Sequence, residues 1–241
     1  MFFVYWDELP ENVGFSIFGP AHILWLAILT AGIAIITIWY YRLRETGRRR
    51  VKRFIGWFLV GEIIVRMIYL LVIGKQTVYE LPLHLCSLAG FLCLLHSYKS
   101  VEWLNQSLYA LCLPGAIFAL LFSDWTIYPA IHFISIEGFS FHAGIVLYVI
   151  CMLVTGQIVP CLKKIWKAFL FLGIAAGAVF VFDKIFDTNY MFLNWPPEKS
   201  PLEWLASFMG NPGYLIGYAV LVFLIPCVMV LAYERIRKWR E

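Results

Sequence analysis

Seven long apolar stretches constrain what this chain can fold into. A helix needs about 20 mostly apolar residues to cross roughly 30 Å of hydrocarbon, and each stretch approaches or exceeds that length. They cover residues 17–41, 54–74, 82–98, 107–123, 140–159, 165–183 and 212–233. The mean hydropathy is +0.79 and only 14% of the residues are charged, against roughly a quarter in soluble proteins. We predict one all-α domain over residues 1–241, a polytopic membrane protein with a bundle of seven transmembrane helices.

The basic residues predict how this bundle is oriented. Lys and Arg collect in short cytoplasmic loops, and seven of the nineteen lie between the first two stretches, at positions 42–53. Others flank the inner ends of later stretches and form the tail, whereas only Lys75, Lys184 and Lys199 fall in the opposite loops. The bias predicts an N-out, C-in protein of the cell membrane. It also accounts for the net charge of +4 without nucleic acid, through topology and attraction to anionic lipid.

The predicted outer loops carry most of the polar and aromatic residues. The longest, residues 184–211, contains Asn189, Asn194, paired prolines and several aromatic residues. Paired prolines prevent a regular helix, and Trp and Tyr favour the headgroup zone. We expect this segment to fold over the outer mouth of the bundle as a lid. The six cysteines fall within or at the ends of the predicted spans, so we expect no structural disulfide.

Three histidines stand near the predicted outer starts of apolar stretches. They are His22, His84 and His142, with His132 in a neighbouring outer loop. In the first two cases a proline two residues earlier suits the first helical position, which places the histidine in the first turn. The positive end of a helix disfavours imidazolium, and a neutral imidazole is what a general base or metal ligand requires. The alternative is a histidine bound to a loop carbonyl. His96 is expected to be structural.

Ionisable residues also lie inside the predicted spans. Glu62 and Arg66 are four residues apart near mid-membrane, so they share a helix face and must point inward, because such groups are costly at that depth. Two interpretations stay open: a buried ion pair, or an Arg66 that binds an anionic group. Asp183, near the outer end of the sixth stretch, is a candidate to orient an imidazole or complete a metal site.

Several strings resemble a known family. They are Leu81-Pro-Leu-His-Leu-Cys-Ser87, Leu113-Pro-Gly-Ala-Ile-Phe-Ala-Leu-Leu121, Tyr128-Pro, Phe141-His142 and Asn189-Tyr-Met-Phe-Leu-Asn194. The chain is similar, from about residue 15 to 235, to the YwaF-type bacterial integral membrane proteins, which resemble eukaryotic transmembrane protein 164. That resemblance implies acyl transfer on lipids, by a cysteine that precedes a histidine, and it maps the histidines to His84 and His142. The cysteine position is Leu83 here, which is not a nucleophile.

Three chemical routes stay open, ranked in this order. In the first, His84 or His142 activates a water or a lipid hydroxyl directly, with Asp183 or Asn189 orienting the imidazoles. In the second, Ser87 or Cys86 is the nucleophile. In the third, His22, His84 and His142 hold a zinc ion; this route ranks last because no close histidine pair occurs along the chain. Otherwise no cofactor is expected.

The function expected from these residues is acyl transfer or acyl-ester hydrolysis on outer-leaflet phospholipids, so that the protein would be a lipid acyltransferase or esterase. A second hypothesis is a transporter or receptor that binds a small polar or anionic ligand near Arg66 and Glu62. A third is a non-catalytic membrane subunit that uses its basic first inner loop. A helix break at Pro114-Gly115 would favour transport. The sequence does not indicate an oligomeric state.

Overall fold

A computed structural model describes residues 1–198 and 200–239, and all regular structure in these residues is helical. The α-helices are α1 (Pro20–Arg42), α2 (Glu45–Val72), α3 (Leu85–Tyr98), α4 (Glu102–Ser107), α5 (Leu113–Leu121), α6 (Phe133–Val154), α7 (Trp166–Phe186), α8 (Pro201–Met209) and α9 (Tyr214–Lys238). Short 3-10 turns are η1 (Trp6–Glu8), η2 (Val78–Glu80), η4 (Asp124–Ile127), η5 (Leu162–Lys164) and η6 (Tyr190–Phe192), and η3 (Leu108–Cys112) is a π-helical turn.

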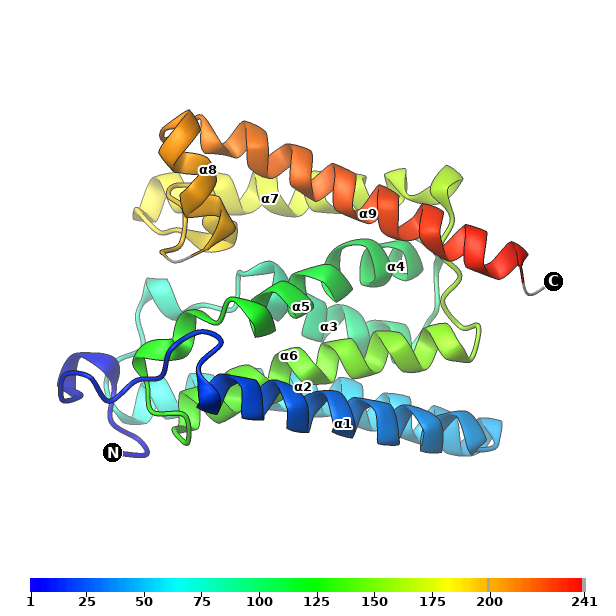
Figure 1. Cartoon of the computed structure of the whole chain (residues 1–241), viewed down its shortest axis with the longest axis horizontal. Coiled ribbons are helices and arrows are strands. Elements are labelled where there is room, and N and C mark those ends of the chain that lie inside the picture. The colour runs from blue at the N-terminus through cyan, green and yellow to red at the C-terminus, as the bar shows by residue number, and fades with distance from the viewer. Residues whose placement is uncertain (199, 240–241) are drawn as a thin grey trace.

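The helices run back and forth between two ends of an elongated bundle (Figure 1). Six helical segments are long and apolar enough to cross a membrane, and α3 is a shorter apolar helix of 14 residues. The predicted all-α, multi-pass membrane fold is therefore confirmed. We call the end that carries the N-terminus, η2, η4 and α8 the mouth end, and the end that carries the C-terminus the basic end (Figure 1).

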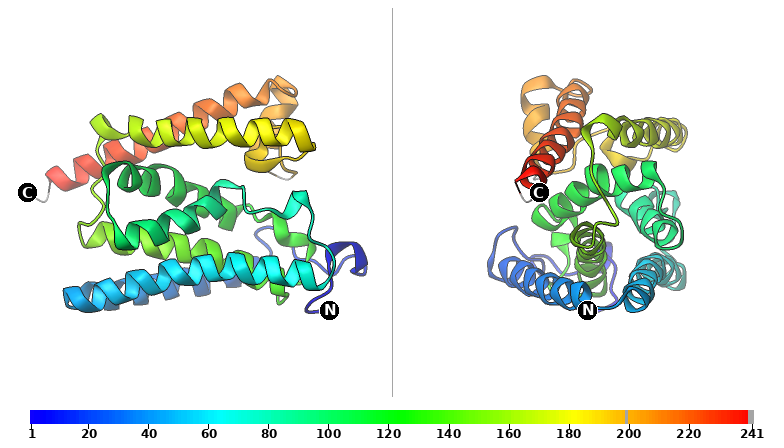
Figure 2. Two further views of the ribbon diagram at one scale, coloured as in Figure 1. Left: turned by 180° about the vertical axis from the view of Figure 1, so that it is seen from behind. Right: turned by 90° about the vertical axis from the view of Figure 1, so that its right-hand side faces the viewer.

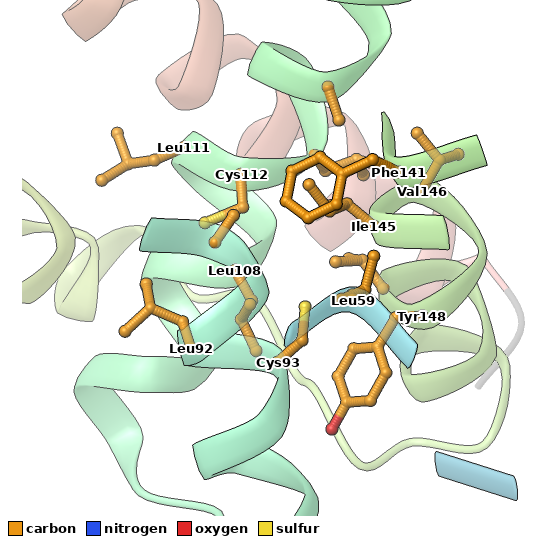
Figure 3. Packing of buried hydrophobic residues seen from close by; sticks show 14 of the residues in the cluster. Leu59, Leu92, Cys93, Leu108, Leu111, Cys112, Phe141, Ile145, Val146 and Tyr148 are labelled. Atoms are coloured by element: carbon orange, nitrogen blue, oxygen red, sulfur yellow. The ribbon is translucent and has the colours of Figure 1, made fainter. Parts of the chain in front are cut away.

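The bundle has two layers (Figures 1 and 2). Helices α1, α2, α3, α5 and α6 form the larger one, and α7, α8 and α9 form the other. The buried core lies in the larger layer, where Leu59, Cys93, Leu108, Phe141 and Tyr148 pack together (Figure 3). Only 6%, 17% and 11% of the apolar windows of α1, α7 and α9 are buried, so most of their residues are not covered by the rest of the chain.

The fourth predicted span is one continuous helical rod built from α4, η3 and α5. At η3 the backbone N–H of Leu113 bonds to the carbonyl of Leu108, five residues back. Pro114 has no N–H to donate, and the π-helical turn directly before it changes the hydrogen-bonding pattern where that donor is missing. The helix continues through Pro114 and Gly115. The helix break suggested at this pair is therefore not present, and a π-helical turn stands before it.

Helix α6 begins at Phe133, seven residues before the predicted span 140–159. The reason is a cap: the ring Nδ1 of His132 accepts a hydrogen bond from the N–H of Ile134 at 3.1 Å, which satisfies a donor that a helix start leaves unpaired. His142 is consequently the tenth residue of α6 rather than a residue of its first turn. Helix α2 similarly starts at Glu45, nine residues before the predicted span 54–74, because Arg and Lys are good helix formers.

Candidate functional site

A cavity of about 570 Å³ lies between the larger layer and the α8–α9 side of the molecule. Its volume is within the range of about 300–1,000 Å³ that is typical of ligand sites. The predicted residues His84, Cys86, Ser87, Arg66 and His142 all line it. Most of its charged side chains come from α2, η2, η4 and α6, whereas α5 and α9 contribute an almost wholly apolar wall. The cavity is thus amphipathic.

His84 is the N-cap of α3 and not a residue of its first turn, because the helix begins at Leu85. Its ring Nδ1 accepts a hydrogen bond from the backbone N–H of Met191 at 3.3 Å, and the rings of Tyr190 and Phe192 lie 5.0 and 5.4 Å away, centroid to centroid. A backbone N–H can only donate, so Nδ1 carries no proton. In this neutral ring the proton is on Nε2, for which no described residue provides a hydrogen bond.

His142 has the opposite arrangement. Its ring Nδ1 lies 2.7 Å from the carbonyl oxygen of Gly138, one turn earlier in α6. A carbonyl only accepts, so Nδ1 carries a proton. When the ring is neutral, its Nε2 therefore presents a lone pair. The ring stacks on Trp125, with centroids 5.2 Å apart and planes at 21°. His142 therefore offers an acceptor where His84 offers a donor, on the wall of one cavity.

His22 and His132 do not belong to this site. The Nδ1 of His22 accepts from the N–H of Phe18 at 2.8 Å, and its Nε2 donates to the carbonyl of Leu120 at 2.8 Å. His132 caps α6 through Nδ1 and bonds to the carbonyl of Val4 through Nε2, and burial lowers the pKa of this ring, which keeps it neutral. Both nitrogens of each ring are engaged in holding loops, so of the four candidate histidines only His84 and His142 line the cavity.

The contacts of His22 do not fit the zinc route. A metal ligand needs a nitrogen lone pair, and both nitrogens of His22 are already engaged. Among the described residues, no group of three or more His, Cys, Asp or Glu side chains has an arrangement that would hold a metal ion.

Arg66 is paired with residues that the sequence analysis did not single out. Its two terminal nitrogens each lie 3.1 Å from a carboxylate oxygen, one of Glu137 on α6 and one of Glu80 in η2. Glu62, the expected partner, instead contacts the hydroxyl of Ser140 at 2.5 Å and does not line the cavity. The sequence would have indicated Glu137 as a partner only if α6 had been predicted to begin at Phe133, because Glu137 then lies inside a membrane-spanning helix.

Asp183 acts on His84 only through the lid. Its Oδ1 accepts from the Thr188 hydroxyl at 2.6 Å and from the backbone N–H of Tyr190 at 2.9 Å. The next N–H along the chain, that of Met191, is the donor to His84. Asp183 is fully buried, and its side chain forms no hydrogen bond with an imidazole of the described residues, so it fixes the loop rather than orienting a histidine directly.

Tyr190 ties the lid to the segment before α3. Its hydroxyl donates to the carbonyl of Val78 and accepts from the N–H of Leu81, both at 2.7 Å. Burial raises the pKa of Tyr190 to about 12, so the hydroxyl keeps its proton for this bond. The loop that contains Met191 is thereby joined to the segment that leads into His84.

Asn189 and Asn194 shape the lid and do not line the cavity. Asn189 Oδ1 accepts from the N–H groups of Asn194 and Trp195 at 3.0 Å each, and Asn194 Nδ2 donates to the carbonyl of Thr188 at 2.6 Å. Their expected role in orienting the imidazoles is thus indirect. Further along, Pro197 and Leu202 line the cavity, so the predicted lid segment contributes to the cavity wall.

The nucleophile candidates occupy different positions. Cys86 and Ser87 line the cavity, because His84 precedes the helix and the first turn of α3 faces the open space. Leu83 packs instead against the cluster of Val179, Tyr190 and Met191 under the lid. All six cysteines are free thiols.

The fold and this cavity define a multi-pass α-helical membrane protein with a polar site toward one end of its bundle. The family model described as the TMEM164 family matches residues 17–230, and the chain belongs to that family. The matched range runs from just before α1 to within α9 and contains both cavity histidines. No curated protein and no solved structure matches the chain.

Proposed function

We propose that the cavity binds a membrane phospholipid and that the protein transfers or hydrolyses its acyl chain. The observation that carries the proposal is the pairing of two neutral imidazoles, one with a free lone pair and one with a free N–H, on a single amphipathic cavity. A lipid ester presents an acyl chain for the apolar wall and a carbonyl for the polar groups. The resemblance to transmembrane protein 164 supports the same class of reaction.

His142 acts as the general base. Its Nε2 takes a proton from a water or lipid hydroxyl, whose oxygen attacks the ester carbonyl carbon to form a tetrahedral intermediate. When the bond to the original alcohol oxygen breaks, the proton on Nε2 passes to that oxygen. With water the products are a fatty acid and a lysolipid; with a lipid hydroxyl they are a new ester and a lysolipid. The Gly138 carbonyl that holds Nδ1–H stabilises the transient imidazolium.

His84 acts as the donor to the carbonyl oxygen. Its Nδ1 is occupied as an acceptor, so the ring does not carry a second proton to give away and serves through its neutral Nε2–H. A neutral imidazole polarises a carbonyl in this way, and one well-placed donor to a developing oxyanion contributes about 100- to 1,000-fold. The two histidines thus have different roles, and only His142 moves a proton.

A protein nucleophile stays the second route. Ser87 and Cys86 line the same cavity, and either would form an acyl-enzyme if His142 removed its proton. The absence of a nucleophile at Leu83 places direct attack first. Under the predicted N-out orientation the mouth end faces the outer leaflet of the cell membrane, which would supply the phospholipid.

The experiment is an acyl-transfer assay on the purified protein in nanodiscs that contain phospholipids with isotope-labelled acyl chains. Labelled fatty acid and labelled transfer product are measured by mass spectrometry, with and without an added lysophospholipid acceptor. The proposal predicts turnover that His142→Asn reduces. An Asn amide at this position retains an N–H near Nδ1 for the Gly138 carbonyl but has no Nε2 lone pair. A wild-type protein that forms neither product, or a fully active His142→Asn, would refute the proposal.

A further inference from the structure

The apolar wall of the cavity is formed by two helices from different layers. The η3–α5 rod contributes Ala110, Leu111, Gly115, Phe118 and Ala119. Helix α9 faces them with Tyr218, Leu221, Val222, Ile225 and Pro226. From Tyr218 to Pro226 the wall follows α9 for eight residues, about 12 Å at 1.5 Å per residue. This apolar limb leads away from the mouth end toward the middle of the bundle.

Gly115 lies in this wall, and no neighbouring atom prevents a larger side chain at this position. A Cβ built on Gly115 meets nothing within 4 Å, although the residue lines the cavity. Gly138, the other glycine in the lining, is different, because a Cβ there would lie 2.8 Å from the Trp125 ring. Glycine inside a helix costs about 1 kcal/mol relative to alanine. At Gly115 no close contact of the backbone offsets this cost. The space that a side chain would occupy there is part of the cavity volume.

The rod remains helical on both sides of Gly115. Pro114 precedes it, and the π-helical turn Leu108–Cys112 comes directly before Leu113. Single π-helical turns are frequent at functional sites. Ala110 and Leu111 of that turn line the cavity as well, so the turn and Gly115 both belong to the part of the limb that the larger layer contributes.

We propose that the limb between the η3–α5 rod and α9 holds the lipid acyl chain and that Gly115 determines how long or bulky a chain it accepts. This inference rests on the proposed function and adds the residue that sets its acyl specificity. A larger side chain at position 115 projects into open space, so it shortens or narrows the limb without displacing its neighbours. The limb of the variant then excludes long chains and still accepts short ones.

The test compares Gly115→Leu with wild type on an equimolar mixture of phospholipids with saturated acyl chains of graded length. Released and transferred chains are quantified by mass spectrometry in nanodiscs. The ratio of longest-chain to shortest-chain product should fall at least about tenfold in Gly115→Leu, since misfit by a methylene in an apolar pocket changes turnover by about 10- to 200-fold. Gly115→Ala should give a smaller shift in the same direction.

The matched control is Gly173→Leu on α7, where a Cβ also meets nothing within 4 Å and which does not line the cavity. It should keep the wild-type chain profile. A second readout needs no turnover: the chain lengths of phospholipids that remain bound to each detergent-purified protein, measured by native mass spectrometry, should shorten only in the position 115 variants.

The outcomes separate this inference from the proposed function. If wild type turns over lipids and both position 115 variants keep its product profile and bound lipids, the inference is overturned and the function stands. If wild type shows no turnover, the function fails, and the bound lipids alone decide whether the limb holds acyl chains. Gly173→Leu shifting the profile as strongly as Gly115→Leu would also overturn the inference.

Discussion

His84 and His142 line one cavity, and each engages its Nδ1 in a hydrogen bond of the opposite role. Nδ1 of His84 accepts from the Met191 N–H, and Nδ1 of His142 donates to the Gly138 carbonyl. The fold therefore fixes complementary tautomers, a donor on one Nε2 and an acceptor on the other. His22 and His132, which stand at similar places in the sequence, have both nitrogens occupied. This difference separates the two cavity histidines from the two that hold loops.

If His142 is the general base, an amide side chain at this position should not restore the rate of acyl-ester cleavage. His142→Asn and His142→Gln should both lower the rate of acyl-ester cleavage by about 100- to 10,000-fold, the usual contribution of a general base, because neither side chain has a basic nitrogen. Rates in nanodiscs at saturating lipid give the measurement, and the thermal unfolding midpoint of each variant shows that it is folded. Equal losses would agree with the account. Substantial activity in His142→Gln would show that hydrogen bonding, not proton removal, is the contribution of this residue.

His84 predicts the opposite pattern. His84→Gln has an amide N–H near the position of Nε2–H, whereas the shorter Asn has none. His84→Asn should therefore lose about 100-fold in rate, and His84→Gln should recover part of it. Asn is also a favoured N-cap residue, so the start of α3 should be retained. The two variants are compared by kcat in the same assay; identical rates for both would contradict a donor role for Nε2.

Asp183 is predicted to be a positioning residue. Asp183→Ala removes the acceptor of the Thr188 hydroxyl and the Tyr190 N–H, which should raise amide hydrogen exchange in residues 187–195 and lower kcat. The same change in a His84→Asn background should lower kcat no further, because the geometry it supports has already been lost. Rates of the single and double variants, with exchange measured by mass spectrometry, test this. Additive losses would mean that Asp183 acts on the bundle in general and not on His84.

The Arg66 cluster predicts a charge-matching effect on stability. Arg66→Met leaves the carboxylates of Glu80 and Glu137 without their cation, and breaking a buried pair costs about 3–5 kcal/mol. Since 36% of the Arg66 side chain is exposed, we expect a loss at or below about 3 kcal/mol of unfolding free energy. Adding Glu80→Gln and Glu137→Gln should restore most of it.

Denaturant unfolding in detergent measures these values. A triple variant no more stable than Arg66→Met would contradict the charge-matching account. The hypothesis of an anionic ligand at Arg66 makes a different prediction: wild-type stability should rise with added inorganic phosphate, although both ends of the guanidinium are already occupied by carboxylates.

The sequence predicted the membrane fold because hydropathy and length alone require it. It misplaced the start of α6 because the cap at His132 lies before the apolar run and is not visible in hydropathy. That displacement left Glu137 outside the predicted span, so Glu62, four residues from Arg66, was the obvious partner. The actual partners are 14 and 71 residues from Arg66 along the chain, and only the tertiary fold brings them together.

The same limit applies to the histidines. Their residue types and positions were visible in the sequence, and His84, His142, Cys86 and Ser87 do share a cavity. Whether the free Nε2 of each ring carries the proton depends on the N–H of Met191, 107 residues from His84, and on the Gly138 carbonyl within α6. The spacing of residues along the chain does not contain this information. The proton position is what distinguishes the proposed base, His142, from the proposed donor, His84.

The most direct test of the central claim is lipid mass spectrometry of membranes from cells that express wild type, His142→Asn or His84→Asn at matched levels. The account predicts that wild type changes the abundance of particular acyl-lipid species, that His142→Asn leaves them at the level of cells without the protein, and that His84→Asn gives a strongly reduced change. Acyl-lipid species that stay the same on wild-type expression, or that change equally in all three, would contradict a catalytic histidine pair.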